Sequence, residues 1–554
     1  MNAAKTMMTA ALAATLALGA EATARKDWKM VPAANLLSPR AYTNAAGEAV
    51  NYRFGQPEKT EPGKTYPLVL YFHGAGERGK DNLAHVRGAG GIEIPNFMKA
   101  NKETCDGYFL AGQCVGGEQW VDTPWGAKDH RMPEKPSVKM ALMLEVLEKT
   151  MAECPVDPER VYVTGLSMGG YGTWDAIQRR PGLFAAALPC CGGGDRELAD
   201  RIKDVPIWAF HGGADGIVPT VRTRIMAGAL WELGSDMHYT EMPGVGHVCW
   251  NRAYQDWDEV LPWLFAQRLS ARGGRAPKFP AEKLDIRKRG PKDGAEKWAA
   301  VSSVARPLVY TNETGATIPY RFAEPDEVKP GETYPLVVWL HGAGERGTNS
   351  GAVLCNGAQE IVNYMKHAAE AGAQPKLGAD GYFLAAQCPK GQQWVDTPWG
   401  ARDHRMPENP SKAMALLIEL LKKTMADYPV DSKRVYVAGV SMGGYGTWDL
   451  VQRFPDLFAA AMPCCGGGDV QLAERLKGVP IWAFHGDRDG IVPFVRSRLM
   501  SAAIWRAGGN LRYTEFRGVG HNSWNPAYND WDVRLKWLFE QRRYSKTTES
   551  FYVN

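Results

Sequence analysis

Short apolar runs alternate with amphipathic stretches along most of this chain. Residues 65–74 (TYPLVLYFHG) are almost continuously apolar and end in a glycine turn, and residues 106–114 (DGYFLAGQC) are similar. Such runs are typical of strands that are buried on both faces. Residues 137–154 (SVKMALMLEVLEKTMAEC) instead have the spacing of an amphipathic helix. The same reasoning predicts strands at 160–165, 184–191, 205–212 and 237–244, and helices at 168–181 and 251–268.

Strands that are separated by helices indicate βαβ units. The predicted fold is therefore α/β, with a mostly parallel sheet covered by helices on both faces. In such sheets, ligands bind beyond the carboxyl ends of the strands. We therefore expect the chemistry of this protein in the loops that follow the strands.

The pattern occurs twice along the chain. VYVTGLSMGGYGTWD from Val161 returns as VYVAGVSMGGYGTWD from Val435, and WVDTPWGAKDHRMPEKPS from Trp120 returns as WVDTPWGARDHRMPENPS from Trp394. A period of this length indicates a duplicated domain rather than a short stacking repeat. We therefore predict two tandem α/β domains. The second copy carries extra residues around 372–379.

The length and charge of the chain fit this division. Its 554 residues exceed the ~250 to 300 at which a single hydrophobic core stops growing. We place the domains at 38–268 and 305–543, joined by a basic segment with Pro and Gly at 269–304. Residues 268 to 297 hold ten Lys or Arg against four Asp or Glu, although the whole chain has a net charge of only +4. The basic segment is interpreted as a solvated linker, which argues against nucleic acid as a partner.

The first 24 residues have the features of a secretory signal peptide. Lys5 precedes an apolar run at residues 7–18, and small residues follow at Ala22 and Ala24. This run is shorter than a membrane span, and no later stretch is apolar enough to cross a bilayer. We expect a secreted or periplasmic protein without membrane insertion. The alternative is an alanine-rich first helix.

A candidate nucleophile follows the predicted strand at 160–165. Residues 165–169 (GLSMG) fit G-x-S-x-G between a strand and a helix, where glycines relieve clashes in a sharp, strained turn. Asp215 and His247 come later, each after a predicted strand, in the order Ser, acid, His that this fold requires. An imidazole would accept the proton of Ser167, and a carboxylate would orient the imidazole. The pattern predicts a hydrolase with a catalytic triad.

The second copy repeats all three residues, as Ser441, Asp489 and His521. If these residues merely capped loops, the same coincidence would have to occur in both copies. Asp487 lies two residues before Asp489 and is a competing acid. Alignment with the first copy favours Asp489.

An oxyanion hole requires two backbone N–H groups aimed at the developing negative charge. The residue after the nucleophile supplies one, and the HGAG turn after the strand at 65–74 supplies the other. The predicted donors are Met168 and Ala75 in the first copy, and Met442 and Ala343 in the second.

These motifs give each copy a resemblance to the α/β-hydrolases. HGAGERG, SMGGYGTWD, HGxxDGIVP and VGHxxW, present in both copies, resemble in particular the esterase-type members allied to carbohydrate esterase family 1, which includes feruloyl and acetyl xylan esterases. The resemblance implies a serine esterase with two catalytic domains that removes feruloyl or acetyl groups from plant cell-wall polysaccharide (arabinoxylan). Close relatives are also described as predicted peptidases, so a serine peptidase of related fold is the first alternative. The second is one active esterase domain whose sibling binds carbohydrate.

The sequence contains no metal-ligand spacing and no phosphate loop of the G-x-x-x-x-G-K type, so neither a metal nor a cofactor is expected. The long loop that follows the strand at 106–114 leaves the sheet at its catalytic edge. Aromatic rings there would stack on a phenolic acyl group or on a sugar. The candidates for substrate contact are the loop tryptophans and those beyond the histidines: Trp120, Trp125 and Trp250, with Trp394, Trp399 and Trp524 as their equivalents.

Other polar and aromatic residues favour structural roles. Trp174 and Trp448 lie inside a predicted helix and are expected in the core. In the long loop, tying down the chain is favoured over substrate contact for Asp129, His130 and Arg131.

The ten cysteines of an exported protein permit disulfides. Cys105 and Cys154 are absent from the second copy and each precedes a predicted strand, so we hypothesise a bridge between them. The neighbouring pairs that end a predicted strand are expected to be small buried residues: Cys190 with Cys191 and Cys464 with Cys465.

Overall fold

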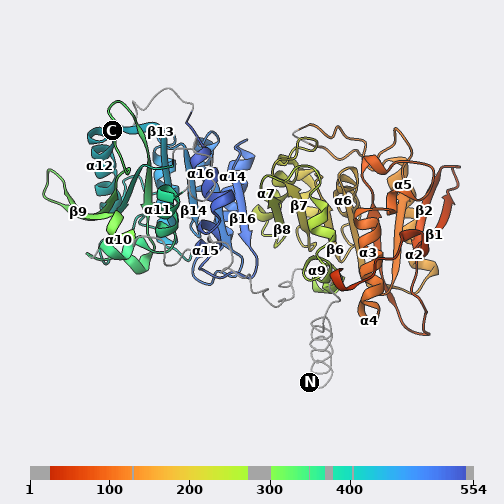
Figure 1. Cartoon of the computed structure of the whole chain (residues 1–554). Helices are drawn as coiled ribbons and strands as arrows, with labels where there is room; N and C mark the ends of the chain where they lie inside the picture. The colour runs from red at the N-terminus through yellow and green to blue at the C-terminus, as the bar shows by residue number, and fades with distance from the viewer. Residues whose placement is uncertain are drawn as a thin grey trace, which may run out of the picture. The chain divides into compact units, whose positions relative to one another are not determined.

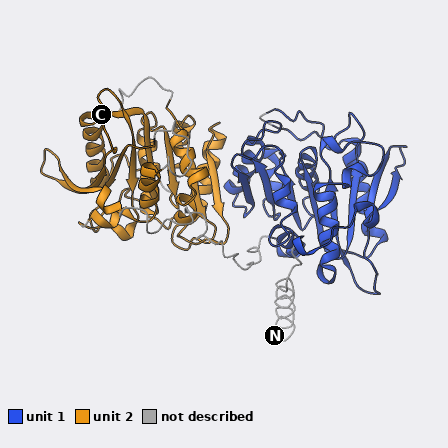
Figure 2. Ribbon diagram, viewed as in Figure 1, with its two compact units in different colours: residues 1–280 blue, residues 281–554 orange. Residues whose placement is uncertain are grey.

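The computed structural model describes residues 25–127, 130–272, 301–348, 350–367, 379–401 and 405–543. The chain divides into two compact units, residues 1–280 and 281–554 (Figure 2). The predicted signal peptide, most of the predicted linker and most of the extra segment around 372–379 lie outside the described residues. The exact limits of the two domains therefore stay predictions.

The first unit is built on an eight-stranded sheet with the order β1-β2-β4-β3-β5-β6-β7-β8 (Figure 1). From β4 through β8 all neighbours are parallel, which confirms the predicted fold class. The exception is the antiparallel edge formed by β1 and β2, which the sequence patterns did not predict. The strands are β1 (Ser38–Thr43), β2 (Ala49–Gly55), β3 (Tyr66–Phe72), β4 (Tyr108–Gln113), β5 (Val156–Leu166), β6 (Ala186–Cys190), β7 (Trp208–Gly212) and β8 (His238–Met242).

The second unit repeats this sheet, with the order β16-β15-β14-β13-β11-β12-β10-β9. Each strand has its counterpart in the first unit, and the edge is again an antiparallel pair. The strands are β9 (Arg306–Thr311), β10 (Thr317–Ala323), β11 (Tyr334–Leu340), β12 (Tyr382–Ala386), β13 (Val430–Val440), β14 (Ala460–Cys464), β15 (Trp482–Gly486) and β16 (Arg512–Phe516).

Helices cover both faces of each sheet. In the first unit, α3, α8 and α9 pack with Tyr71 and Phe109 into one hydrophobic core, and α5 and α6 contact the sheet from the other side. The helices are α2 (Ala33–Leu36), α3 (Ala89–Ala100), α4 (Lys102–Cys105), α5 (Val138–Glu153), α6 (Met168–Arg179), α7 (Val221–Glu232), α8 (Trp250–Tyr254) and α9 (Val260–Ala266). Those of the second unit are α10 (Val301–Val304), α11 (Ala358–His367), α12 (Lys412–Asp427), α13 (Met442–Arg453), α14 (Val495–Arg506), α15 (Trp524–Tyr528) and α16 (Lys536–Glu540).

The local sequence explains where these elements begin and end. All seven residues of β3 are buried, as expected for an apolar strand covered on both faces. Ser137 caps α5, since its hydroxyl accepts the backbone N–H of Met140. The single helix predicted at 251–268 is wrong, because the chain breaks after α8. There the Asp256 carboxylate accepts the N–H of Glu259 and starts a new helix.

The disulfide hypothesis is not supported, because both thiols are free. Cys105 lies in the core with Phe109, on one face of β4. Cys154 lies beside Tyr108, whose pKa it helps to raise. Neighbouring strand residues point to opposite faces of a sheet, so the sheet separates the two cysteines.

The described helices include none that is both long and apolar enough to cross a membrane.

Close backbone packing at the end of β5 leads to a stability prediction. A Cβ at Gly169 would lie 2.0 Å from the carbonyl oxygen of Phe72. We expect Gly169→Ala to destabilise the first unit by about 1–3 kcal/mol, because the backbone must shift to make room. Gly182→Ala is the matched control, since nothing lies within 4 Å of a Cβ there. Urea unfolding measures both, and equal midpoints for the two variants would contradict the packing argument.

Candidate active site

Ser167 occupies the sharp turn between β5 and α6. Its backbone has φ 54° and ψ −118°, a left-handed conformation that costs energy for any residue with a side chain. Ser441 adopts the same conformation between β13 and α13, with φ 56° and ψ −119°. Strain at the same position in both units is typical of a nucleophile held out of its strand–helix turn.

The structure brings the three predicted residues of the first unit together. The Nε2 atom of His247 lies 2.8 Å from the Oγ of Ser167, and its Nδ1 lies 2.7 Å from the Oδ2 of Asp215. With a neutral imidazole, Nδ1–H donates to the carboxylate and Nε2 accepts the serine hydroxyl. This is the geometry for moving the serine proton to the histidine.

The second unit has the same geometry. The Nε2 atom of His521 lies 2.9 Å from the Oγ of Ser441, and its Nδ1 lies 2.7 Å from the Oδ2 of Asp489. The competing acid, Asp487, instead accepts the backbone N–H of Gly518 at 2.7 Å. The geometry therefore favours Asp489 as the partner of the histidine.

The two buried acids are strongly held in the ionised form. Burial alone would raise the pKa of Asp215, but hydrogen bonds from His211, His247 and two backbone N–H groups outweigh it and keep the pKa well below its ordinary value. The pKa of Asp489 is lowered in the same way. Burial is the largest single effect on His521 and lowers its pKa, but the hydrogen bond to Asp489 and the nearby charges of Cys465 and Asp489 together outweigh it, so the net shift of the pKa is upward. The carboxylate thus favours the imidazolium that proton transfer would create.

The predicted oxyanion donors lie on chain segments that border the nucleophile. Met168 is the first residue of α6, and Ala75 begins the 3₁₀ turn that follows β3. The strands β3 and β5 are neighbours, so these segments leave the same sheet edge together. In the second unit a Cβ on Gly342 would lie 3.6 Å from the Cβ of Ser441, next to Ala343.

Two of the predicted substrate contacts are corrected by the structure. Trp120 and Trp394 are fully buried, and their indole N–H groups donate to the carbonyls of His73 and His341 at 3.0 and 3.1 Å. They pack beneath the turn before the predicted oxyanion donors. Their position in a long loop did not reveal that they point into the core.

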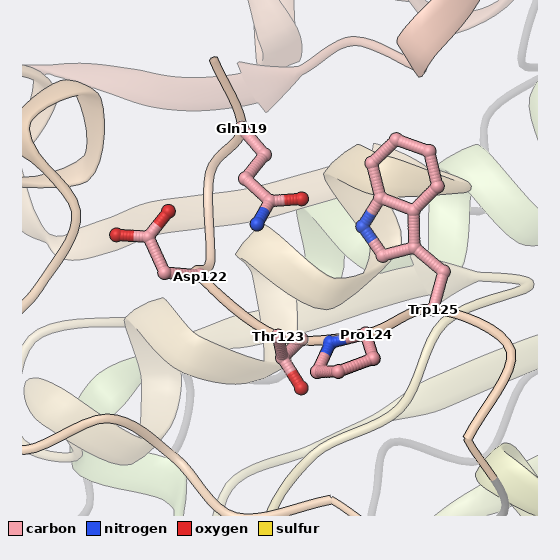
Figure 3. A pocket seen from close by; sticks show the side chains of 5 residues that line it. All are labelled: Gln119, Asp122, Thr123, Pro124 and Trp125. Atoms are coloured by element: carbon pink, nitrogen blue, oxygen red, sulfur yellow. The ribbon is translucent and has the colours of Figure 1, made fainter. Parts of the chain in front are cut away.

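Trp125 lines a cavity, and its contact with substrate stays a prediction. The cavity has a volume of ≈ 490 Å³ and is formed by Gln119, Asp122, Thr123, Pro124 and Trp125. The amide of Gln119 and the indole of Trp125 point toward each other from opposite sides (Figure 3). Tyr171, one helical turn after the nucleophile, donates its hydroxyl to the carbonyl of Trp125 at 3.0 Å. This bond links the cavity wall to the helix that carries Ser167.

Trp250 and Trp524 lie beside the two active-site histidines. Their rings meet those of His247 and His521 edge to face, with centroids 5.3 Å apart in both units. Both are only partly buried, so they remain candidates for substrate contact. Trp399, the equivalent of Trp125, is also partly buried. Trp174 and Trp448 lie in the core, as expected.

The long loop is tied to its own domain by the residues predicted to do so. His130 is buried, stacks on Tyr171 and lies 3.3 Å from the hydroxyl of Thr123. Arg131 donates to the carboxylate of Asp195 at 3.2 Å. Asp129 lies outside the described residues.

Sequence reasoning missed one feature of each triad. The thiol of Cys191 lies within 4.8 Å of the ligand atoms of Asp215 and His247, a set that could hold a metal ion, and Cys465 repeats this in the second unit. The carboxylate and imidazole are already hydrogen-bonded to each other, so the geometry favours proton transfer over metal binding. Cys190, Cys191, Cys464 and Cys465 are all buried, as predicted.

A second histidine was also missed. His211 lies 3.3 Å from the Oδ2 of Asp215, and His485 lies 3.2 Å from that of Asp489. Each precedes its acid by four residues, in the HGGADG and HGDRDG motifs. The repetition of this histidine in both copies was the available signal.

Comparison with known proteins finds a similarity in both units. The profile of the dienelactone hydrolase family matches residues 129–260 and 401–537. One match lies in each unit, so both units are similar to this family over those residues. The two matches contain all six triad residues of the chain.

Individual known proteins are similar to parts of this chain. The bifunctional acetylxylan esterase/xylanase XynS20E of Neocallimastix patriciarum is 33% identical over 78 residues, which is 14% of this chain and 11% of that protein. A probable carboxylesterase of Oryza sativa subsp. japonica is 24% identical over 233 residues, 40% of this chain and 96% of the relative. The solved structure of a thermostable esterase is 39% identical, with a TM-score of 0.38, and covers 44% of this chain and 64% of its own. The chain thus spans only a ninth of the first relative and under two thirds of that structure.

The raised pKa of His521 predicts the pH dependence of the second unit. The histidine must be neutral to accept a proton, so activity is lost as pH falls through its pKa. In Ser167→Ala, where only the second triad is intact, we expect the acid limb of kcat/KM above the ordinary histidine value of about 6.5. A pH–rate profile measures it. An acid limb below that value would contradict the assigned electrostatics.

Proposed function

We propose that both units are serine carboxylic-ester hydrolases that act through an acyl-enzyme intermediate. The observation that carries this proposal is the complete Ser–His–Asp chain of hydrogen bonds in each unit, with the serine in a strained turn. Esterases among the relatives support it. The dual geometry argues against the alternative in which one sibling only binds carbohydrate.

The proposed reaction follows from the positions of these groups. Ser167 attacks the ester carbonyl while His247 takes its proton, and Asp215 stabilises the imidazolium. The backbone N–H groups of Met168 and Ala75 stabilise the oxyanion, and the histidine then protonates the departing alcohol. Water, activated by the same histidine, releases the acid and frees the serine. The second unit follows the same reaction with Ser441, Asp489 and His521. Its oxyanion donors are Met442 and Ala343.

The proposed substrates are feruloyl or acetyl esters of plant cell-wall polysaccharide. Support comes from the aromatic wall that Trp125 provides to the cavity, and from the acetylxylan esterase named among the relatives. Such a polymer is met outside the cell, which agrees with the predicted signal peptide. A secreted or periplasmic location is part of the proposal.

Nucleophile variants test the activity directly. We expect Ser167→Ala and Ser441→Ala each to remove the turnover of one unit. In the double variant we expect the total turnover of the chain to fall by up to ~10⁶-fold. Initial rates on methyl ferulate, acetylated xylan and a peptide anilide measure the loss and the substrate class.

The substrate panel also decides between the alternatives. Hydrolysis of the anilide in preference to both esters would establish a peptidase. Ester hydrolysis that survives unchanged in the double variant would overturn the assignment of the nucleophiles. Loss of all activity in one single variant would show that only that unit is catalytic.

A further inference from the structure

A second imidazole contacts the acid of each triad, at the same carboxylate oxygen as the catalytic histidine. The Nε2 atom of His211 lies 3.3 Å from the Oδ2 of Asp215 and 3.1 Å from the carbonyl oxygen of Val218. When Asp215 is ionised, neither neighbour has a proton to donate, so both can only accept a hydrogen bond. The Nε2 atom of His211 must therefore carry a proton.

The other nitrogen of His211 meets a hydroxyl group that also contacts a backbone carbonyl. Its Nδ1 lies 2.7 Å from the hydroxyl oxygen of Thr223, and that hydroxyl donates to the carbonyl of Gly192 at 2.9 Å. A hydroxyl has a single proton. With this proton directed to Gly192, Nδ1–H of His211 donates to the hydroxyl oxygen. This arrangement favours a proton on both nitrogens.

The second unit reproduces this network with a different residue. His485 lies 3.2 Å from the Oδ2 of Asp489 and 3.1 Å from the carbonyl of Val492. Its Nδ1 lies 2.8 Å from the hydroxyl of Ser497, which donates to the carbonyl of Gly466. Serine replaces threonine here, yet the hydroxyl and its direction are retained.

The charges that face His211 favour a cation. His211 on β7 lies opposite Glu241 on β8, and Glu241 is paired with Arg224 of α7 at 2.6 Å. Asp215, Glu241 and Arg224 together carry one negative charge in a buried region. A doubly protonated His211 brings this group to neutrality, which lowers the cost of burying the charges. His485 lies opposite Glu515, which is paired with Arg498 in the same way.

We infer that His211 and His485 are cationic positioning residues, which hold the catalytic carboxylate at the oxygen that the catalytic histidine also contacts and share its charge with that histidine. This inference rests on the proposed function, since it assigns a role at the same triads. A cation beside Asp215 weakens the stabilisation that this carboxylate gives to a protonated His247. The imidazole therefore stays neutral and able to accept a proton. The device acts on the triad without touching the substrate.

The test uses Ser441→Ala as the parent, so that only the first unit reports. His211→Gln keeps a donor near the position of Nε2 but removes the charge, and His211→Phe removes both. We expect His211→Gln to retain kcat within a few fold and to move the acid limb of kcat/KM upward by about one pH unit, because His247 then faces an uncompensated carboxylate. We expect His211→Phe to lose on the order of ten- to a hundredfold in kcat, with KM unchanged.

The control places His211→Gln in Ser167→Ala, where only the second unit reports and its profile should not change. An unshifted acid limb in the first unit would overturn the assigned charge, and full kcat in His211→Phe would overturn the positioning role. An inactive Ser441→Ala parent would instead count against the proposed function.

A second measurement observes the charge in the active protein itself, and a variant serves only to assign the signal. In the full chain labelled with ¹⁵N-histidine, we expect one imidazole, assigned by its loss in His211→Gln, to carry protons on both nitrogens at neutral pH. A single protonated nitrogen on His211 would overturn the inference.

Discussion

The close backbone packing at the turn between β5 and α6 is the constraint on which each active site depends. A Cβ at Gly169 would lie 2.0 Å from the carbonyl of Phe72, and one at Gly443 would lie 1.8 Å from that of Leu340. Only glycine permits this approach, which presses the start of the helix against the end of the neighbouring strand. This close packing holds Ser167 at φ 54°. The packing of the buried sheet around the turn compensates for the strained backbone.

The parallel sheet then assembles the other groups around this turn. Strands β3, β7 and β8 end at the same edge as β5, and the segments that follow them bring the HGAG turn, Asp215 and His247 to the nucleophile. The acid is the electrostatic centre of this arrangement, because two imidazoles and two backbone N–H groups point at it. The negative charge of Asp215 interacts with both the catalytic His247 and the cationic His211 inferred above.

Patterns that depend on local chemistry could be predicted from the sequence. The apolar run of β3 and the order of Ser167, Asp215 and His247 needed only neighbouring residues and the rules of parallel sheets. The predictions that failed were those that depended on the direction in which a single side chain points. The loop containing Trp120 was correctly placed at the active edge, yet its indole points into the core, and Cys105 faces away from Cys154 across the sheet. The role of His211 required a complete hydrogen-bond network, which no spacing reveals.

The central claim is that one chain carries two serine nucleophiles of equal geometry. Reaction of the full chain with a fluorophosphonate, which phosphonylates only serines activated by a neighbouring base, tests it most directly. Intact mass and peptide mapping should show two adducts for each chain, one on Ser167 and one on Ser441. An unlabelled chain, a single adduct, or labelling at any other residue would contradict the account.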